Sequence, residues 1–495
     1  MAIPSLVMRP SAEAAGRLYS VLPNNGDGDF QFNRDSSATL INSKGLIQTV
    51  GYFGSELVVN KYFNDSSWWG LDPSWSISGG SANSNGTGTI YKGGVVTIGK
   101  TYKVAVSVSS YTSGALTYPN ASNYNIPSAV GVYTFYYTAN SQTISLTGNS
   151  FIGSIDSVSV KEVLGDRPRF NYEITNGLVG GCPSFLLEGQ RTNYISYSEK
   201  FSLWTITSSI TVSDNQVISP DGTLNASILD FTSAVSSDGV YSFTGNRTGS
   251  LSRSIYLKGA VGGETVQLSD PYLGGGSIKT LTTEWQRFLY ISTAESLNSG
   301  IWLRNSPGNV IYAYAAQLEE GSYATSYIPT LNGVIQTRAA ETCFGAGNAS
   351  TFNSTEGTIY FEGSALADDG TNRYFSLDDG TASNYIYFRY VSTSNNVLFR
   401  TAIAGVTINT LTVVLSDTTQ NHKFAFKWKS GDYALWVDGV EISTDSSATT
   451  FPSNTLNNLG FKFPSSTGGF YANTKDIRVY NEALTDLQLQ KLTTL

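Results

Sequence analysis

Residues 182–204, CPSFLLEGQRTNYISYSEKFSLW, mark a boundary between two parts of the chain. The apolar run at 185–187 predicts a buried strand, and the charged and polar residues at 188–193 are typical of a chain that leaves such a strand in a turn. The apolar and aromatic residues that come next alternate with Ser, Glu and Lys, as at the first edge of a new domain. We therefore interpret 182–204 as a hinge. The anchors on its far side are Tyr194, Ile195, Tyr197, Phe201 and Trp204.

The composition predicts an all-β protein of several domains. A chain of 495 residues suits roughly two to four domains of about 100–200 residues each. Only 14% of the residues are charged, whereas Gly, Tyr and Phe number 49, 30 and 24. This composition is typical of β-sandwiches with long polar turns, and a large helical protein would need more Glu, Lys, Arg and Ala.

The net charge of the chain argues against some classes of binding partner. A net charge of −8 and an isoelectric point near 4.9 argue against nucleic acid and against an anionic membrane, because both require clustered Lys and Arg. Neutral glycans stay compatible with this charge. No apolar run of about 18 residues occurs, and the N-terminus has no basic segment followed by a long apolar core. We therefore expect a soluble chain that does not use the general secretion pathway.

The carboxylates and the single histidine do not predict catalysis. A retaining glycosidase needs two carboxylates that face each other at about 5–5.5 Å. Asp368 with Asp369, and Asp378 with Asp379, are instead adjacent pairs, and neighbours on a strand point to opposite faces. His422 alone does not define a Ser/His/Asp set. We therefore expect no enzyme activity.

Two interpretations stay open for Asp378 and Asp379. They are either solvated turn carboxylates or ligands of Ca²⁺, the one cofactor that hard oxygen ligands would suit. A transition-metal site is disfavoured because Cys182 and Cys343 stand far apart and the chain has one His. Whether the two cysteines form a disulfide stays open.

Aromatic residues are the candidates for glycan binding, because their rings stack on sugar rings. The segment YTSGALTYPNASNYNIPSAVG at 111–131 places Tyr111, Tyr118 and Tyr124 among Asn, Ser and Gly. Such a composition predicts an exposed, adaptable recognition loop, although a contact with another protein would use the same residues. Trp68 is the fourth candidate.

Several motifs resemble those of bacteriophage virion proteins of the head-fibre and tail-fibre type. The longest is FLLEGQRTNYISYSEKFSLW at 185–204; the others are the Arg-x-Ser-Ser-Ala-Thr turn at 34–39, Asn-Ser-x-Gly-Leu-Ile at 42–47 and RPRFNYE at 167–173. In these proteins the leucine-rich strand and the Arg-Thr-Asn turn open a jelly-roll module. The resemblance also implies that 42–47 should run on into RPRFNYE, so that the residues between them are an insertion.

The resemblance divides the chain into modules. The two jelly rolls look like copies of one architecture, since Phe63 with Trp68 corresponds to Phe201 with Trp204, and both resemble carbohydrate-binding modules. The resulting modules are an N-terminal attachment segment at 1–54 that continues at 166–192, an inserted galactose-binding-like jelly roll at 55–165, a second jelly roll at 193–330, a linker at 331–351, and a laminin-G/concanavalin-A-like domain at 352–495.

Local patterns predict two elements of the last domain. Phe424, Phe426 and Trp428 alternate with smaller or charged residues before a turn at 430–432, which predicts a β-hairpin. The leucines at 481–492 recur near helical spacing and predict the one clear helix of the chain. The stretch at 12–18 is the one other segment that we consider helical.

The resemblance implies a virion structural protein, a fibre or spike subunit on the head or the tail that mediates adsorption to host-surface glycan. It implies three kinds of partner: other capsid or tail proteins, host polysaccharide, and further copies of the chain in a homotrimer. Residues 1–54 would hold the subunit to the virion, and 352–495 would face outward. Two alternatives stay open, a non-viral lectin-like surface adhesin and a glycan-degrading depolymerase.

Overall fold

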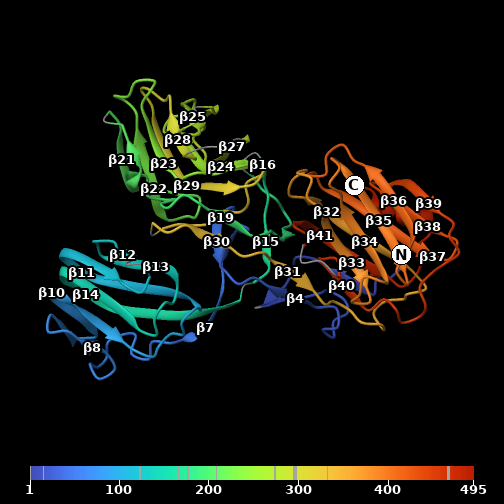
Figure 1. The fold of residues 1–495 in the computed structure, drawn as a ribbon, viewed down its shortest axis with the longest axis horizontal. Coiled ribbons are helices and arrows are strands. Elements are labelled where there is room, and N and C mark those ends of the chain that lie inside the picture. Colours follow the sequence, from blue (N-terminus) through green and yellow to red (C-terminus); the bar gives the residue numbers. More distant parts are fainter. Residues whose placement is uncertain are drawn as a thin grey trace. The chain divides into compact units, whose positions relative to one another are not determined.

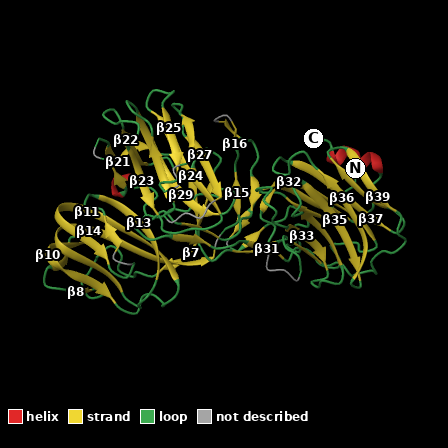
Figure 2. Ribbon diagram, turned by 45° about the horizontal axis from the view of Figure 1, so that its top comes forward, coloured by secondary structure: helices red, strands yellow, loops and turns green. Residues whose placement is uncertain are grey.

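The computed structural model describes residues 2–14, 16–121, 124–165, 167–175, 178–207, 209–272, 275–293, 298–331, 333–464 and 469–495. Within these ranges the chain is all-β, as predicted, with a single α-helix (Figure 1; Figure 2). It forms two compact units. One comprises Gly51–Gly165 with Leu331–Val334, and the other comprises Met1–Val50, Asp166–Thr330 and Ile335–Leu495.

Two long antiparallel strands organise the unit at Gly51–Gly165. They are β11 (Thr101–Tyr118) and β14 (Ile144–Gly165), and they pair along most of their length (Figure 1). The core beneath them consists of residues of this unit alone. The other strands are β7 (Tyr52–Glu56), β8 (Gly70–Leu71), β9 (Trp75–Ser78), β10 (Ser81–Lys92), β12 (Tyr124–Ile126) and β13 (Gly131–Thr138).

The part of the chain from Trp204 to Glu320 forms a jelly roll of two five-stranded sheets in the order β20-β23-β28-β25-β26 and β21-β22-β29-β24-β27. A short 3₁₀ helix at Phe201–Leu203 precedes them. The strands are β20 (Thr205–Ile206), β21 (Thr211–Ile218), β22 (Leu224–Asp230), β23 (Gly239–Phe243), β24 (Ser250–Gly259), β25 (Thr265–Ser269), β26 (Ser277–Thr280), β27 (Gln286–Thr293), β28 (Gly300–Arg304) and β29 (Val310–Glu320).

The C-terminal sandwich also has two sheets. One runs β15 (Arg169–Asn171), β18 (Ser184–Leu186), β41, β32, β37, β38 and β39, and β1 (Leu6–Met8) also pairs with β41. This sheet faces the sheet β36-β35-β34-β33-β40. Stacked phenylalanines fill the space between them; Phe399 and Phe426 lie 5.0 Å apart and almost parallel. The strands are β32 (Glu356–Ala365), β33 (Arg373–Asp378), β34 (Tyr385–Tyr390), β35 (Asn396–Ile403), β36 (Val406–Val414), β37 (His422–Lys429), β38 (Tyr433–Val437), β39 (Val440–Asp445), β40 (Asn458–Gly460) and β41 (Ala472–Tyr480).

Both local predictions for this domain hold in outline. The hairpin is formed by β37 and β38, with Phe424 opposite Val437. The helix α1 is shorter than predicted: it spans Asp486–Thr493 because Thr485 and Gln488 form a capping box that sets its first turn. It is the only helix among the described residues that reaches two turns, and no described helix has the length and apolarity to span a bilayer.

The N-terminal segment at 1–54, expected to hold the subunit to the virion, packs as part of the C-terminal sandwich. Strand β1 (Leu6–Met8) pairs with β41, with Leu6 opposite Val479. Leu6, Met8 and Phe30 are fully buried in the same core as the stacked phenylalanines. The apolar residues of the segment are too few for a core of their own, but they complete one that the end of the chain begins.

The rest of this segment is also strand. Residues 12–18, which we considered helical, contain β2 (Glu13–Ala14) and β3 (Arg17–Leu18), which pair with each other. The sheet continues from β3 to β4 (Phe30–Asn33) and then to β31 (Thr342–Phe344). The remaining short strands are β5 (Ala38–Ile41), β6 (Ile47–Val50), β16 (Ile174–Thr175) and β17 (Leu178–Val179).

The stretch at 182–204 is held on both sides, which corrects its interpretation as a hinge. Strand β18 (Ser184–Leu186) lies between β15 (Arg169–Asn171) and β41, and Phe185 is fully buried in the sandwich core. Strand β19 (Arg191–Asn193) pairs with β30 (Gln336–Arg338). Cys182 is exposed and Cys343 is buried, and both are free thiols.

We expect residues 51–165 to be removable without unfolding the remainder. Strand β7 pairs with the end of β14, with Tyr52 opposite Gly165, so the entry and the exit of this unit are neighbours about 5 Å apart. A variant that joins residue 50 to residue 166 should keep a cooperative thermal transition, measured by circular dichroism. Residues 51–165 expressed alone should fold as well, which serves as the control. A non-cooperative melt of the shortened chain would refute this expectation.

Candidate binding surface and its structural support

The tyrosines predicted to form an exposed loop are largely buried, so this prediction is wrong for most of them. Tyr118 on β11 is fully buried and its hydroxyl lies 3.2 Å from that of Tyr137. Tyr124 on β12 is 7% exposed. Tyr111 is half-buried and donates a hydrogen bond of 3.1 Å to the carbonyl oxygen of Gly114. The segment continues as strand up to Tyr118, so its rings fill the core.

Trp68 keeps partial exposure. Its ring meets that of Trp69 edge to face at 4.7 Å, and the ammonium of Lys92 lies 5.3 Å from its ring centroid. Of the four predicted residues, Trp68 and Tyr111 are those with surface accessible to a ligand.

Protein donors surround both aspartates considered for calcium. Asp378 is 1% exposed and accepts hydrogen bonds from Ser376, Asn458 and the backbone N–H of Gly380, and its burial raises the pKa of its carboxyl. Asp379 accepts from Thr381 in the following turn. Within the described residues, no group of three or more His, Cys, Asp or Glu side chains could hold a metal ion. These contacts favour the structural interpretation, with Asp378 buried rather than solvated.

The outward face of the sheet β20-β23-β28-β25-β26 carries an aromatic cluster that the sequence analysis missed. Trp302 on β28 lies opposite Tyr241 on β23, with Phe243 two residues further along. Their neighbours Ile301 and Leu303 are fully buried in the core, so the three rings lie on the other face of the sheet. The alternation in GIWLRN at 300–305 carries this signal, because Trp302 stands between two aliphatic residues.

One edge of the Trp302 indole packs against β23. It covers Gly239, where a Cβ atom would collide with the indole Nε1 and Cδ1. The ring centroid of Tyr241 lies 5.8 Å from that of Trp302, with an interplanar angle of 66°. The ring centroid of Phe243 lies 5.1 Å from that of Tyr241, and Phe243 is 48% exposed. Glycine at 239 therefore allows an aromatic platform that larger side chains would displace.

Polar groups border this platform. The guanidinium carbon of Arg304 lies 4.2 Å from the ring centroid of Trp302. Gln267 on β25 lies opposite Arg304 on β28. The side-chain amide of Asn305 donates a hydrogen bond to the side-chain oxygen of Gln267. Aromatic faces bind the C–H surfaces of sugar rings, and guanidinium and amide groups bind hydroxyls, so this cluster has the chemistry of a glycan-binding surface. We name Tyr241, Phe243, Trp302, Arg304 and Gln267 the Trp302 face.

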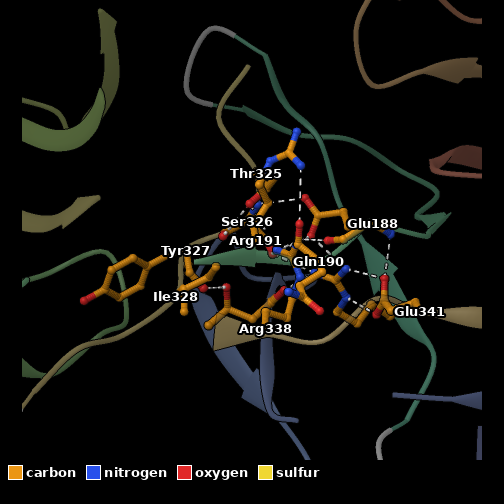
Figure 3. A network of polar contacts seen from close by, with 12 residues as sticks. Glu188, Gln190, Arg191, Thr325, Ser326, Tyr327, Ile328, Arg338 and Glu341 are labelled. Carbon is orange, nitrogen blue, oxygen red and sulfur yellow. Dashed lines mark hydrogen bonds and ion pairs between the residues drawn. The ribbon is translucent and has the colours of Figure 1, made fainter. Parts of the chain in front are cut away.

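A buried ion network supports the unit that carries this face (Figure 3). The carboxylate of Glu341 accepts from Arg34 and from Arg169, whose Nε lies 2.8 Å from Oε1. The carboxylate of Glu188 forms ion pairs with Arg169 and Arg338, each with an N–O distance of 2.8 Å. All five side chains are at most 3% exposed.

The electrostatics of the network explain its stability. Burial opposes ionisation of Glu188, but Arg338 and Arg169 outweigh it and hold the pKa of its carboxyl far below the ordinary value. The pKa of Glu341 is lowered in the same way, by Arg169 and Arg34. The guanidinium groups also donate hydrogen bonds to backbone carbonyls: Arg169 donates one of 2.9 Å to the carbonyl oxygen of Thr39. The network is closed to solvent, so its role is structural.

The members of the network come from motifs that are far apart in the sequence. Arg34 opens the turn at 34–39, Arg169 lies in RPRFNYE, and Glu188 lies in the stretch at 185–204. Arg338 and Glu341 complete it from QTRAAE at 336–341. The first three motifs are recognisable in the sequence, but nothing in their spacing predicts that they meet. A pocket of about 190 Å³ borders the network, which is smaller than most ligand sites at roughly 300 Å³ or more.

A second polar cluster of the same unit contains a carboxyl group with an unusual pKa. Glu199 accepts a hydrogen bond of 2.8 Å from the hydroxyl of Tyr327, and burial raises its pKa to about 7, with the charge of Asp221 adding to the effect. Asp221 is half-buried, and although burial alone raises the pKa of its carboxyl, hydrogen bonds from Thr223 and Ser219 outweigh that effect and lower it. The two carboxyl groups therefore ionise in different pH ranges.

No protein-family model and no curated protein sequence matches the chain. Among solved structures, parts of the chain are similar to the CBM40 domain of the Ruminococcus gnavus IT-sialidase bound to α2,3-sialyllactose, at 17% identity and a TM-score of 0.26 over 30% of this chain and 87% of that one. Domain 4 of AbnA, a GH43 arabinanase from Geobacillus stearothermophilus in complex with arabinotriose, matches at 12% identity and a TM-score of 0.26, over 31% and 73%.

A NanB sialidase from Streptococcus pneumoniae is similar at 13% identity and a TM-score of 0.25, over 30% of this chain and 25% of that one. At these identities and TM-scores, none of the three likenesses bears on what this chain binds.

Replacing Arg169 by Ala should destabilise the larger unit by about 3–5 kcal/mol, because it removes the guanidinium that Glu188 and Glu341 share and leaves the charges of the buried network unbalanced. Urea unfolding followed by tryptophan fluorescence measures the loss. Lys429→Ala is the control: it breaks the exposed ion pair with Glu356 in the same unit and should change the midpoint little. An Arg169→Ala midpoint equal to that of the control would contradict the role of the network.

Glu199 should make the larger unit less stable as pH rises. Its folded pKa of about 7 exceeds the ordinary 4.5, so the folded state holds a proton that the unfolded state releases. The contribution of this proton to the free energy of unfolding is complete below pH 4.5. It falls by at most about 3 kcal/mol as pH rises through 7. Urea midpoints at pH 5 and pH 8 measure this, and Glu199→Gln should reduce the difference. An unchanged difference in that variant would show that another group is responsible.

Proposed function

We propose that this chain is a glycan-binding structural subunit and that the Trp302 face is its binding surface. The observation that carries the proposal is the partly exposed cluster of the Trp302, Tyr241 and Phe243 rings, with Arg304 over the Trp302 ring and Gln267 beside it. Aromatic rings beside hydrogen-bonding groups suit a pyranose, which has an apolar face and a hydroxylated rim. The net charge of −8 favours a neutral glycan over most of the surface, whereas the guanidinium of Arg304 would donate hydrogen bonds to a carboxylated sugar at the Trp302 face.

We propose further that the subunit is part of a bacteriophage virion, as a head or tail fibre or spike, and that it binds polysaccharide on the host surface. The support is the resemblance of the motifs at 34–39, 167–173 and 185–204. Each of them supplies one member of the buried ion network, namely Arg34, Arg169 and Glu188. Shared motifs that serve one physical purpose are a stronger basis for a resemblance than scattered identities.

The proposed partners are other capsid or tail proteins and two further copies of this chain in a homotrimer. The N-terminal segment at 1–54 completes the C-terminal sandwich, so attachment would use its exposed surface and not an unfolded arm. Deletion of 1–54 or of 352–495 would damage the same core, and neither deletion can separate attachment from adsorption. Point variants on exposed surfaces serve that purpose better.

Trp302→Ala should weaken binding to host-surface polysaccharide at least about tenfold, because buried aromatic anchors contribute most to such surfaces. Calorimetric titration of the full chain with purified polysaccharide measures the affinity. Tyr62→Ala, which removes a 54% exposed ring from the other unit, is the matched control and should bind as the unmodified chain does.

Two outcomes would count against the proposal. Equal affinity of Trp302→Ala and the unmodified chain would place the binding surface elsewhere, with Trp68 and Tyr111 the next candidates. Release of new reducing ends from the polysaccharide would favour the depolymerase alternative over binding without cleavage. Immunogold labelling of purified particles tests the virion location independently of the glycan.

A further inference from the structure

An outward sheet face of the C-terminal sandwich carries two arginines. Arg389 on β34 and Arg400 on β35 each follow a phenylalanine of the core, so their side chains leave the opposite face of the sheet. Arg400 lies opposite Tyr387, two residues before Arg389, which makes the two arginines diagonal neighbours across the strands. Both are half-buried. We name Tyr387, Arg389 and Arg400 the arginine face.

The two guanidinium groups share one aromatic ring. The guanidinium carbon of Arg389 lies 5.8 Å from the ring centroid of Tyr387, and that of Arg400 lies 5.7 Å from it. Arg389 also donates a hydrogen bond of 3.3 Å to the hydroxyl of Tyr374. The Nε of Arg400 donates one of 3.0 Å to the hydroxyl of Thr410. These contacts hold both side chains on the face and keep two positive charges close together.

The charge of the arginine face is not balanced by the chain itself. Within the part of the chain that the structure describes, neither guanidinium pairs with a carboxylate, although the chain has 38 Asp and Glu residues against 30 Lys and Arg. Asp378 lies on the same face of the sheet, opposite Tyr385, but its carboxylate accepts hydrogen bonds from other donors. The Nε of Arg389 is buried and has no hydrogen-bond partner. Like charges repel each other, so a bound anion would stabilise this face.

The arrangement suits the carboxylate of an acidic sugar. A guanidinium binds a planar carboxylate through two parallel N–H···O bonds, and each arginine here keeps N–H donors that the two hydroxyls do not take. The hydroxyls of Tyr374 and Thr410 can exchange hydrogen bonds with those of a sugar. The ring of Phe463, which is half-buried and 5.9 Å from that of Tyr374, adds an apolar border.

We propose that the arginine face is a second ligand site and that it binds the carboxylate of a uronic acid in a host glycan. The inference rests on the glycan binding of the proposed function and adds the charge class of a second contact. The arginine face lies on the C-terminal sandwich and shares no residue with the Trp302 face, so each site has its own test.

Calorimetric titration of the full chain with trigalacturonate tests the inference. The same trisaccharide with its carboxyls reduced to alcohols should bind at least about tenfold more weakly, because it loses the charge-assisted hydrogen bonds. Arg389→Gln and Arg400→Gln should each weaken trigalacturonate binding to a similar degree. Arg17→Gln is the matched control: it removes the same charge from a 57% exposed arginine of the same unit and should bind as the unmodified chain does.

Chemical modification of the unmodified chain keeps the test valid where a variant fails to fold. Phenylglyoxal reacts with accessible guanidinium groups, so bound trigalacturonate should slow the modification of Arg389 and Arg400 but not that of Arg17. Mass spectrometry of peptides measures the modification at each residue.

The outcomes separate this inference from the proposed function. The inference is overturned if trigalacturonate does not bind, if both Gln variants bind it as the control does, or if it leaves the modification of Arg389 and Arg400 unchanged. None of these results bears on the Trp302 face, which host polysaccharide and Trp302→Ala test separately. Protection of both arginines together with an unchanged affinity of Trp302→Ala for host polysaccharide would support the arginine face and contradict the Trp302 face.

Discussion

The ion network around Glu188 and Glu341 is the constraint on which the larger unit depends. Burying a guanidinium or a carboxylate is costly unless its partners are in place, so no part of the network is stable alone. Arg34 and Glu341 are separated by 307 positions in the sequence. The N-terminal segment, the stretch at 185–193 and the exit of the jelly roll must therefore all be in position before any of their charges is satisfied, which makes the assembly of this unit cooperative.

Patterns of short range were predictable from the sequence, and long-range pairings were not. The hairpin at Phe424 and Val437 and the all-β fold follow from alternation and turn chemistry, which act within a few residues. The pairing of Leu6 with Val479 leaves no local trace, because a three-residue apolar strand looks the same whether it is free or paired. The network likewise required partners that only the fold brings together.

The candidate site shows the same limit. Tyr118 and Trp302 are both aromatic residues on strands, yet the first is fully buried and the second lies on an outward face. What distinguishes them is the identity of the neighbours: Trp302 stands between two core aliphatics, and across the sheet Gly239 leaves room for its ring. Composition identifies aromatic segments, whereas the face of each ring depends on strand phase and on cross-strand partners.

The position of β1 beside β41 has a consequence for synthesis on the ribosome. The first strand of the chain emerges hundreds of residues before its partner, and Leu6, Met8 and Phe30 must stay exposed until then. The unit at Gly51–Gly165 has a core of its own and can fold early, while the apolar start of the chain waits. During translation, this waiting apolar segment is exposed to aggregation and is a natural target of chaperones.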